Sequence, residues 1–295
     1  MEKGKILKGF SGFYYVDIKG EEIECSLRGK YRRKKQDFLP GDEVEISIIA
    51  DNKGVIEKVI PRKNQLVRPP IANIDQVIIV MAVKEPELQL TFLNRLLVLA
   101  EYKEIRPIIC LNKADLLDEN EQEEVKDIIR DYETIGYKVI LVSAKQNLGI
   151  EEFREELQNK TTVFAGLSGA GKSSLLNKIH PGLSLKVGEV SKKIKRGRHT
   201  TRHVELMPLS TGGIVADTPG FSNLELSEIP SNYLSYCFPE IERKQVDCKF
   251  TGCRHIKEKS CAIRDALEKN EILESRYNDY MHFLEEIEET ERRYK

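Results

Sequence analysis

The sequence predicts a multidomain α/β protein in which a small N-terminal β-barrel precedes an open α/β core, and a helical domain with a candidate metal site follows. Three observations predict this order. Residues 1–66 alternate polar and apolar side chains over short stretches, residues 67–224 alternate apolar strands with helices, and residues 225–295 hold a cluster of cysteines. We expect one domain from each of these ranges.

Composition limits the classes of protein to which this chain can belong. Of its 295 residues, 40% are hydrophobic, which is enough for buried cores, and the formal net charge is only −1. Any binding of nucleic acid must therefore depend on local basic patches. No apolar run approaches the roughly 18 residues of a membrane-spanning helix, and the start MEKGKILKGFSG does not read as a signal peptide. We expect a cytoplasmic protein without membrane association, whose six cysteines serve as thiols or metal ligands.

Residues 1–66 are predicted to form a barrel. Apolar side chains alternate with polar ones over 23–27 and 44–48, which is the period of a half-buried strand. Residues 13–18 and 54–60 read as further strands, with glycine, proline and asparagine between the segments. Five short strands in so short a segment suit a barrel of the OB type.

A basic segment separates two of these strands. Arg28 to Lys35 contains six cations, one aromatic residue and no acid. On an OB-type barrel such a loop can bind RNA through phosphate attraction and base stacking. The alternative is a solvated basic loop without a partner.

Residues 67–224 follow the pattern of an open parallel sheet. The run 75–83 is almost continuously apolar, as expected of a strand that is covered on both faces. Strands at 106–111, 138–142 and 161–165 follow, separated by stretches with helical periodicity. This alternation predicts ligand sites at the carboxyl ends of the strands.

The strand at 161–165 leads into a phosphate-binding motif. Gly166 to Ser173 matches G-x-x-x-x-G-K-S/T, and a helix-like stretch follows. In such a loop, backbone N–H groups face phosphate oxygens, the lysine reaches the β- and γ-phosphates, and the serine ligates Mg²⁺. The alternative is a glycine-rich turn with a stray lysine. The predicted nucleotide-binding residues here are Gly166, Leu167, Ser168, Gly169, Ala170, Gly171, Lys172, Ser173 and Ser174.

Two further motifs select the base. The aspartate of Asn112-Lys-Ala-Asp115 can accept hydrogen bonds from guanine N1–H and the exocyclic amine, donors that adenine does not present there. The asparagine would brace the loop, the lysine stem would cover the ring, and a backbone N–H of Ser143-Ala-Lys145 would reach guanine O6. The alternative for 112–115 is a plain helix N-terminus. The predicted base-site residues are Asn112, Lys113, Asp115, Ser143, Ala144 and Lys145.

Two segments after the P-loop are predicted to act as switches. In Asp217-Thr-Pro-Gly220 the aspartate would hold Mg²⁺ through water, and the Gly220 N–H would sense the γ-phosphate. Either Thr200 or Thr201 would supply a hydroxyl to Mg²⁺, and spacing alone leaves both open.

The catalytic group is harder to identify. Many GTPases place a water-orienting glutamine after this glycine, but Phe221 stands there and cannot polarise water. His199 is the nearest candidate replacement, since a neutral histidine can position or deprotonate water. The alternatives are a solvated histidine or an activating partner that completes the site. In each case we expect slow turnover by the isolated protein.

The C-terminal segment contains a metal-binding pattern. Cys248, Cys253, His255 and Cys261 offer three thiolates and one imidazole, a set suited to closed tetrahedral Zn²⁺. No fifth group indicates an open position, so we expect one structural zinc ion in a helical zinc-binding domain. The alternative is three reduced cysteines and a surface histidine.

The order of these motifs is unusual. Ordinary small GTPases run from the P-loop through D-x-x-G to N-K-x-D and S-A-K, whereas here the last two come first, so the core is circularly permuted. The D-x-x-G segment therefore leads directly into the C-terminal domain, and we expect the nucleotide state to act on that domain. With the linker run 68–76 and Gly197-Arg-His-Thr-Thr201, the chain resembles the RsgA (YjeQ) family of circularly permuted GTPases over essentially its full length.

The resemblance implies a GTP hydrolase that acts late in the assembly of the small (30S) ribosomal subunit. It further implies that the enzyme binds the rRNA of this subunit and that the small subunit stimulates its GTP hydrolysis. It also implies that His199 is the catalytic histidine and that Thr201, rather than Thr200, ligates Mg²⁺. We expect a monomer. Two other classes stay open: a P-loop ATPase or nucleotide kinase with an RNA-binding appendage, and a non-enzymatic RNA-binding zinc protein.

Overall fold

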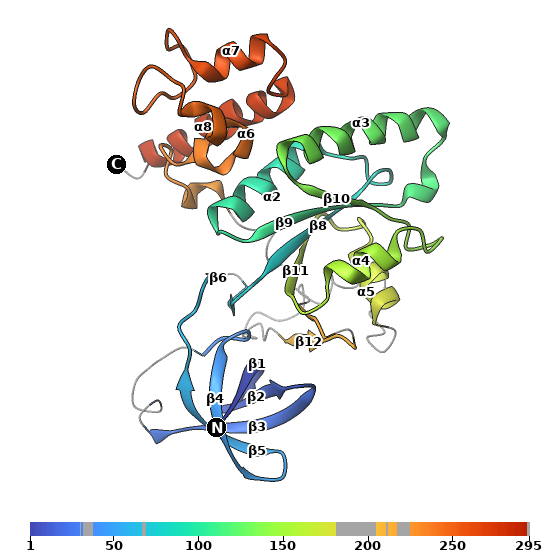
Figure 1. Cartoon of the computed structure of the whole chain (residues 1–295), viewed down its shortest axis with the longest axis vertical. Helices are drawn as coiled ribbons and strands as arrows, with labels where there is room; N and C mark the ends of the chain where they lie inside the picture. The colour runs from blue at the N-terminus through green and yellow to red at the C-terminus, as the bar shows by residue number, and fades with distance from the viewer. Residues whose placement is uncertain are drawn as a thin grey trace.

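The computed structural model describes residues 1–29, 31, 38–66, 69–180, 205–210, 212–216 and 225–293. These residues form a closed five-stranded barrel, a six-stranded sheet with helices, and a group of C-terminal helices. Figure 1 shows the barrel at one end of the molecule, the C-terminal helices at the other and the sheet between them. The fold class expected from the sequence is confirmed.

The barrel closes with the strand order β1-β2-β3-β5-β4, and β1 also pairs with β4. Ile6, Val16, Ile46 and Ile56 are among the residues that fill its interior. Four strands match the stretches predicted from the sequence, and β1 supplies the fifth, so this is the expected OB-type barrel. The strands are β1 (Glu2–Phe10), β2 (Phe13–Ile18), β3 (Glu21–Leu27), β4 (Glu43–Ala50) and β5 (Lys53–Val59).

The segment that joins the barrel to the sheet reads only as a linker in the sequence, but it is structured. Strands β6 (Gln65–Leu66) and β7 (Ile71–Ala72) form a small antiparallel hairpin. The Arg62 guanidinium donates two hydrogen bonds, of 2.6 and 2.8 Å, to the buried Asp42 carboxylate of the barrel. The linker is therefore fixed to the barrel by a charged contact that apolar periodicity does not reveal.

The core sheet has the strand order β10-β9-β8-β11-β13-β12, and all its pairs are parallel except β12 with β13. All residues of β8 are buried, as the apolar run predicts. Because the strands are parallel, the loops after β8, β9, β10 and β11 meet at one edge. The strands are β8 (Gln76–Ala82), β9 (Arg106–Asn112), β10 (Lys138–Leu141), β11 (Thr161–Ala165), β12 (Leu206–Pro208) and β13 (Ile214–Ala216).

Helices cover both faces of the sheet (Figure 1). Side chains of β8 divide between two apolar layers: Val77 and Ile79 belong to the layer of α2 and α3, and Ile78 and Val80 to that of α4 and α5. Within the described residues, no helix combines the length and the apolar character needed to cross a bilayer. These helices are α2 (Leu90–Tyr102), α3 (Glu119–Ile135), α4 (Ile150–Glu156) and α5 (Lys172–Ile179).

The C-terminal helices pack on the layer formed by α2 and α3. One apolar cluster contains Leu93 and Leu97 of α2 together with Phe283 and Ile287 of α8. These helices therefore share a core with the sheet. The C-terminal elements are η5 (Leu226–Glu228), η6 (Leu234–Cys237), α6 (Pro239–Gln245), α7 (Ala262–Glu268) and α8 (Glu274–Arg293).

A buried polar network also connects α8 to this layer. Arg276 of α8 is fully buried, and its guanidinium donates to Glu240 of α6 at 2.7 and 3.1 Å and to Asn94 of α2 at 2.9 Å. Asn94 in turn donates to Asp279 at 2.5 Å and accepts from the Tyr132 hydroxyl at 2.6 Å. Four helices thus meet at one set of charged and polar groups.

Candidate nucleotide and metal sites

The P-loop joins β11 to α5 at the carboxyl edge of the sheet. Gly166 has a φ of +127°, and a Cβ at this position would lie 2.0 Å from the Val80 carbonyl oxygen of β8. Gly171 has a φ of +95°, and a Cβ there would lie 2.1 Å from the side-chain nitrogen of Asn112. Both positions therefore require glycine. The loop passes directly against the ends of β8 and β9.

The charged group of the loop lies at the start of α5. Lys172 opens this helix, and its ammonium donates to the carbonyls of Gly166 and Leu167 at 2.7 and 2.8 Å. Ser173 and Ser174 follow in the same first turn. A helix N-terminus with a lysine folded over the preceding loop favours the binding of an anion, such as a phosphate chain.

Asn112 connects the P-loop with the S-A-K segment. Its amide nitrogen donates to the Ala170 carbonyl at 2.9 Å, and its amide oxygen accepts from the Ala144 N–H at 3.3 Å. The residue is only 1% exposed. One side chain therefore brings three segments together that are far apart in the chain.

Asp115 presents an oriented carboxylate at the same edge. Its Oδ1 accepts from the Ser143 hydroxyl at 2.5 Å, and the Lys145 ammonium lies 3.8 Å from Oδ2. The side chain is 5% exposed. A short 3₁₀ helix, η1 (Ala114–Leu116), has Asp115 in its first turn, and α3 begins at Glu119 with Asp118 as its cap. The helix N-terminus that the sequence left open is thus present as one short turn, and within it Ser143 orients the Asp115 carboxylate.

A cavity of about 390 Å³ lies between these segments. Glu85 and Lys178, which motif reasoning missed, contribute to its lining. Glu85 follows the end of β8, so its position after a strand was the signal that could have identified it. The lining residues that the motifs did predict are Asn112, Lys113, Asp115, Ala144, Lys145, Gly171 and Ser174.

Several predicted residues lie outside the part of the chain that the structure describes. The basic segment 28–35 is also described only at Arg28, Gly29 and Tyr31. The roles of these residues as catalytic group, switch contacts and magnesium ligands therefore stay predictions. The predicted site residues concerned are His199, Thr201, Asp217 and Gly220, together with the alternative Thr200.

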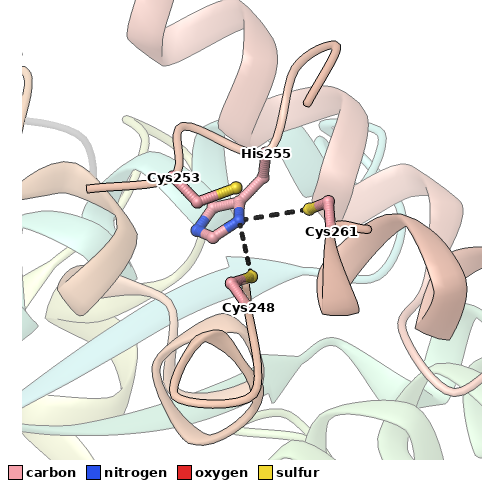
Figure 2. Close-up of side chains that lie close together, drawn as sticks. All are labelled: Cys248, Cys253, His255 and Cys261. Atoms are coloured by element: carbon pink, nitrogen blue, oxygen red, sulfur yellow. Dashed lines mark hydrogen bonds between the residues drawn. The ribbon is translucent and has the colours of Figure 1, made fainter. Parts of the chain in front are cut away.

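The four predicted metal ligands converge in the C-terminal part of the molecule. Figure 2 shows Cys248, Cys253, His255 and Cys261 around one point, and their ligand atoms all lie within 4.8 Å of one another. His255 Nδ1 is 3.4 Å from the Cys261 sulfur and 3.7 Å from the Cys248 sulfur. In a tetrahedral site with Zn–S of about 2.3 Å and Zn–N of about 2.0 Å, such atoms are about 3.5–3.8 Å apart. The donor set therefore fits Zn²⁺.

Burial controls the protonation of these donors. It raises the pKa of the Cys253 thiol to about 12 and also raises the pKa of Cys261, whereas it lowers the pKa of His255. A neutral imidazole is the form that binds a metal, but buried thiols need a nearby cation to become thiolates. The segment that carries the four metal ligands is also hydrogen-bonded to α8, because the Tyr277 hydroxyl donates to the His255 carbonyl at 2.7 Å.

The fold and the sites together define a class of protein. A parallel sheet carries a P-loop, and the base-site motifs at the same edge precede that P-loop in the chain. An OB-type barrel comes before this core and a Cys₃His group comes after it. This combination defines a circularly permuted GTPase.

The chain belongs to the RsgA GTPase family. The family model of the RsgA N-terminal domain matches residues 3–56, and that of the RsgA GTPase matches residues 59–227. The protein is therefore a GTP hydrolase, an activity that requires a guanine nucleotide and Mg²⁺.

Similarity to individual relatives extends over the whole chain. A protein of Geobacillus sp. (strain WCH70), named small ribosomal subunit biogenesis GTPase RsgA, is 48% identical over 294 residues, covering 100% of both chains. A protein of Bacillus subtilis (strain 168) with the same name is 45% identical over 299 residues, again covering 100% of both.

Two solved structures share the fold. YjeQ from Thermotoga maritima has a TM-score of 0.86 at 40% identity, covering 97% of this chain and 98% of that one. YloQ, described as a circularly permuted GTPase, has a TM-score of 0.86 at 41% identity, covering 98% of this chain and 96% of that one.

Proposed function

We propose that this GTPase acts in the late maturation of the small ribosomal subunit in the cytoplasm, as a monomer that binds rRNA and is stimulated by the subunit. The observation that carries the proposal is the full-length similarity to proteins named for that role. We assign 1–66 to the RNA-binding barrel, 67–224 to the permuted GTPase core and 225–295 to the zinc-binding domain.

Asp115 would read the base. The Ser143 hydroxyl holds one of its carboxylate oxygens at 2.5 Å, so the acceptor is oriented before the nucleotide arrives. Guanine donates from N1–H and from its exocyclic amine, whereas adenine would leave a largely buried carboxylate unpaired. The Lys113 stem would cover the ring, and a backbone N–H of Ala144 or Lys145 would reach O6.

The P-loop would bind the phosphate chain. The Lys172 ammonium already lies over the loop, and it would pass from the loop carbonyls to phosphate oxygens. Ser173, with Thr201 and Asp217 from the switch segments, would hold Mg²⁺, which neutralises phosphate charge when bound. The Gly220 N–H would contact the γ-phosphate and report its presence.

His199 would orient the attacking water. Phe221 has no polar group for this purpose, so the residue after D-x-x-G cannot do it. Positioning dominates phosphoryl transfer, so we expect slow turnover unless a partner holds His199 in place. In this proposal the small subunit stimulates hydrolysis by holding His199 against the water.

Zinc would have a structural role. All four donors belong to one compact group without a fifth ligand among the described residues. When bound, the ion would stabilise the thiolates of Cys248, Cys253 and Cys261. It would link the chain just after α6 to the start of α7. Because His255 also accepts from Tyr277, the zinc loop would be fixed to α8.

The test is the rate of GTP hydrolysis with and without purified small ribosomal subunits. We expect strong stimulation by small subunits and none by large subunits. Lys172→Ala should abolish the stimulated rate, because it removes the charge that holds the phosphates. A rate that small subunits leave unchanged would overturn the ribosomal role, and equal turnover of ATP would overturn the guanine site.

A further inference from the structure

We propose that the Glu85 carboxylate repels the phosphate chain of the bound nucleotide and so limits how tightly and for how long the protein holds GTP and GDP. The inference rests on the proposed guanine-nucleotide site and deepens it. Glu85 belongs to none of the motifs that the sequence offers.

The loop that carries Glu85 is anchored to both ends of the nucleotide site. The Lys113 ammonium donates to the Glu85 carbonyl, so the backbone of this residue is held beside the lysine that would cover the base. The next residue, Pro86, lies against the P-loop, since its Cδ is 3.7 Å from where a Cβ of Gly169 would be. The position of Glu85 is therefore fixed between the base site and the phosphate site.

A bound nucleotide must bridge the same two ends. With its base at Asp115 and its terminal phosphates in the P-loop, its sugar and α-phosphate lie between them. Glu85 lines this cavity and its side chain is exposed. Across the described residues, no cation forms an ion pair with its carboxylate, whereas Asp115 has Ser143 and Lys145 as partners. The adjacent Lys84 interacts with Glu85 electrostatically, but its ammonium forms its ion pair with Glu121. The charge of Glu85 therefore borders the ligand with only partial compensation.

Elementary electrostatics gives the size of the effect. Two unit charges about 7 Å apart in water interact strongly enough to change an affinity about threefold. A phosphate chain carries several charges, so the total effect is roughly three- to tenfold. Lys178 lines the same cavity with the opposite charge and should strengthen binding by a similar factor. A lower affinity for GDP favours the spontaneous exchange of GDP for GTP.

The experiment compares nucleotide affinities of the full-length, zinc-loaded protein by titration calorimetry. The ligands are GDP, a non-hydrolysable GTP analogue and ATP, each at low and high salt. Glu85→Gln should bind both guanine nucleotides roughly three- to tenfold more tightly at low salt, and the gain should vanish near 1 M salt, where the screening length is about 3 Å. Lys178→Gln should show the opposite change.

Glu87→Gln is the matched control. Glu87 is an exposed acid of the same loop that does not line the cavity, so its removal should leave the affinity unchanged. An unchanged or weaker affinity of Glu85→Gln would overturn the proposal, and so would an equal gain in Glu87→Gln. Failure of the underlying site has a separate signature: wild-type protein that binds ATP as tightly as GDP, or neither, would overturn both.

Discussion

Replacing Glu240 with glutamine tests how much the buried ion pair between α6 and α8 contributes to the stability of the fold. Glu240 is 7% exposed and accepts from Arg276 at 2.7 and 3.1 Å. Glutamine keeps the shape of the side chain but removes its charge, so the guanidinium, which is 1% exposed, loses its counter-ion. Removal of one partner of a buried ion pair costs about 3–5 kcal/mol.

This cost is large in relation to the whole stability. Folded proteins are stable by only about 5–15 kcal/mol. In a chain of this size a loss of 1 kcal/mol lowers Tm by about 2–4 °C. We therefore expect Glu240→Gln to lower Tm by about 6–20 °C. The assay is thermal unfolding of the zinc-loaded full-length protein, followed by circular dichroism at constant zinc.

Glu286→Gln is the matched control, because this acid of α8 also forms an ion pair between two helices, here with Arg95 of α2. Its partner Arg95 lies at 2.5 Å, but the Glu286 side chain is 40% exposed. Such a pair contributes about 0–1 kcal/mol, so Tm should fall by at most about 4 °C. Equal shifts in the two variants would refute the reasoning. Arg276→Met combined with Glu240→Leu removes both charges and should recover much of the loss.

Three further predictions concern the sites. Asp115→Asn should lower the affinity for GTP about 100-fold or more and raise that for xanthosine triphosphate in a competition assay, and unchanged selectivity would contradict the base site. His199→Ala should keep its affinity for GTP but lose about 10²–10⁴-fold in turnover stimulated by small subunits; full stimulated turnover would assign the water to a group from the partner. Chelation of zinc should lower Tm and the helical signal, and added Zn²⁺, but not Mg²⁺, should restore both. A Tm that the chelator leaves unchanged would exclude a structural role for zinc.

The nucleotide site is predictable from the sequence because its constraints are local. Gly166 and Gly171 meet backbone demands that other residues cannot meet, and each base-reading motif lies at or just after the end of a strand. A short contiguous pattern therefore contains most of the required geometry. The same holds for the metal ligands, which come from a single short segment around His255.

Contacts between distant segments escape such reasoning. The spacing of Leu273, Tyr277, Tyr280, Leu284 and Ile287 predicts one face of a helix, which the structure shows as α8. This spacing gives no reason to bury Arg276. That reason is Asn94, 182 residues earlier, whose amide oxygen accepts from the guanidinium. In the same way, the position of Glu85 after a strand suggests a site residue, but its place between the base site and the phosphate site is seen only with Lys113 and the P-loop beside it. The pairing of a buried charge is a property of the assembled fold.

The contact between α2 and α8 has a consequence for how the protein is made. Asn94 and Asp279 form a hydrogen bond of 2.5 Å although 185 residues separate them. A bacterial-type synthesis rate of about 5–20 residues per second leaves about 10–40 s between the emergence of the two helices. During that time the apolar face around Leu97 lacks part of its cover, which the later elements η6 and α8 supply. Nascent chains of this protein should therefore depend on chaperones until α8 has been synthesised.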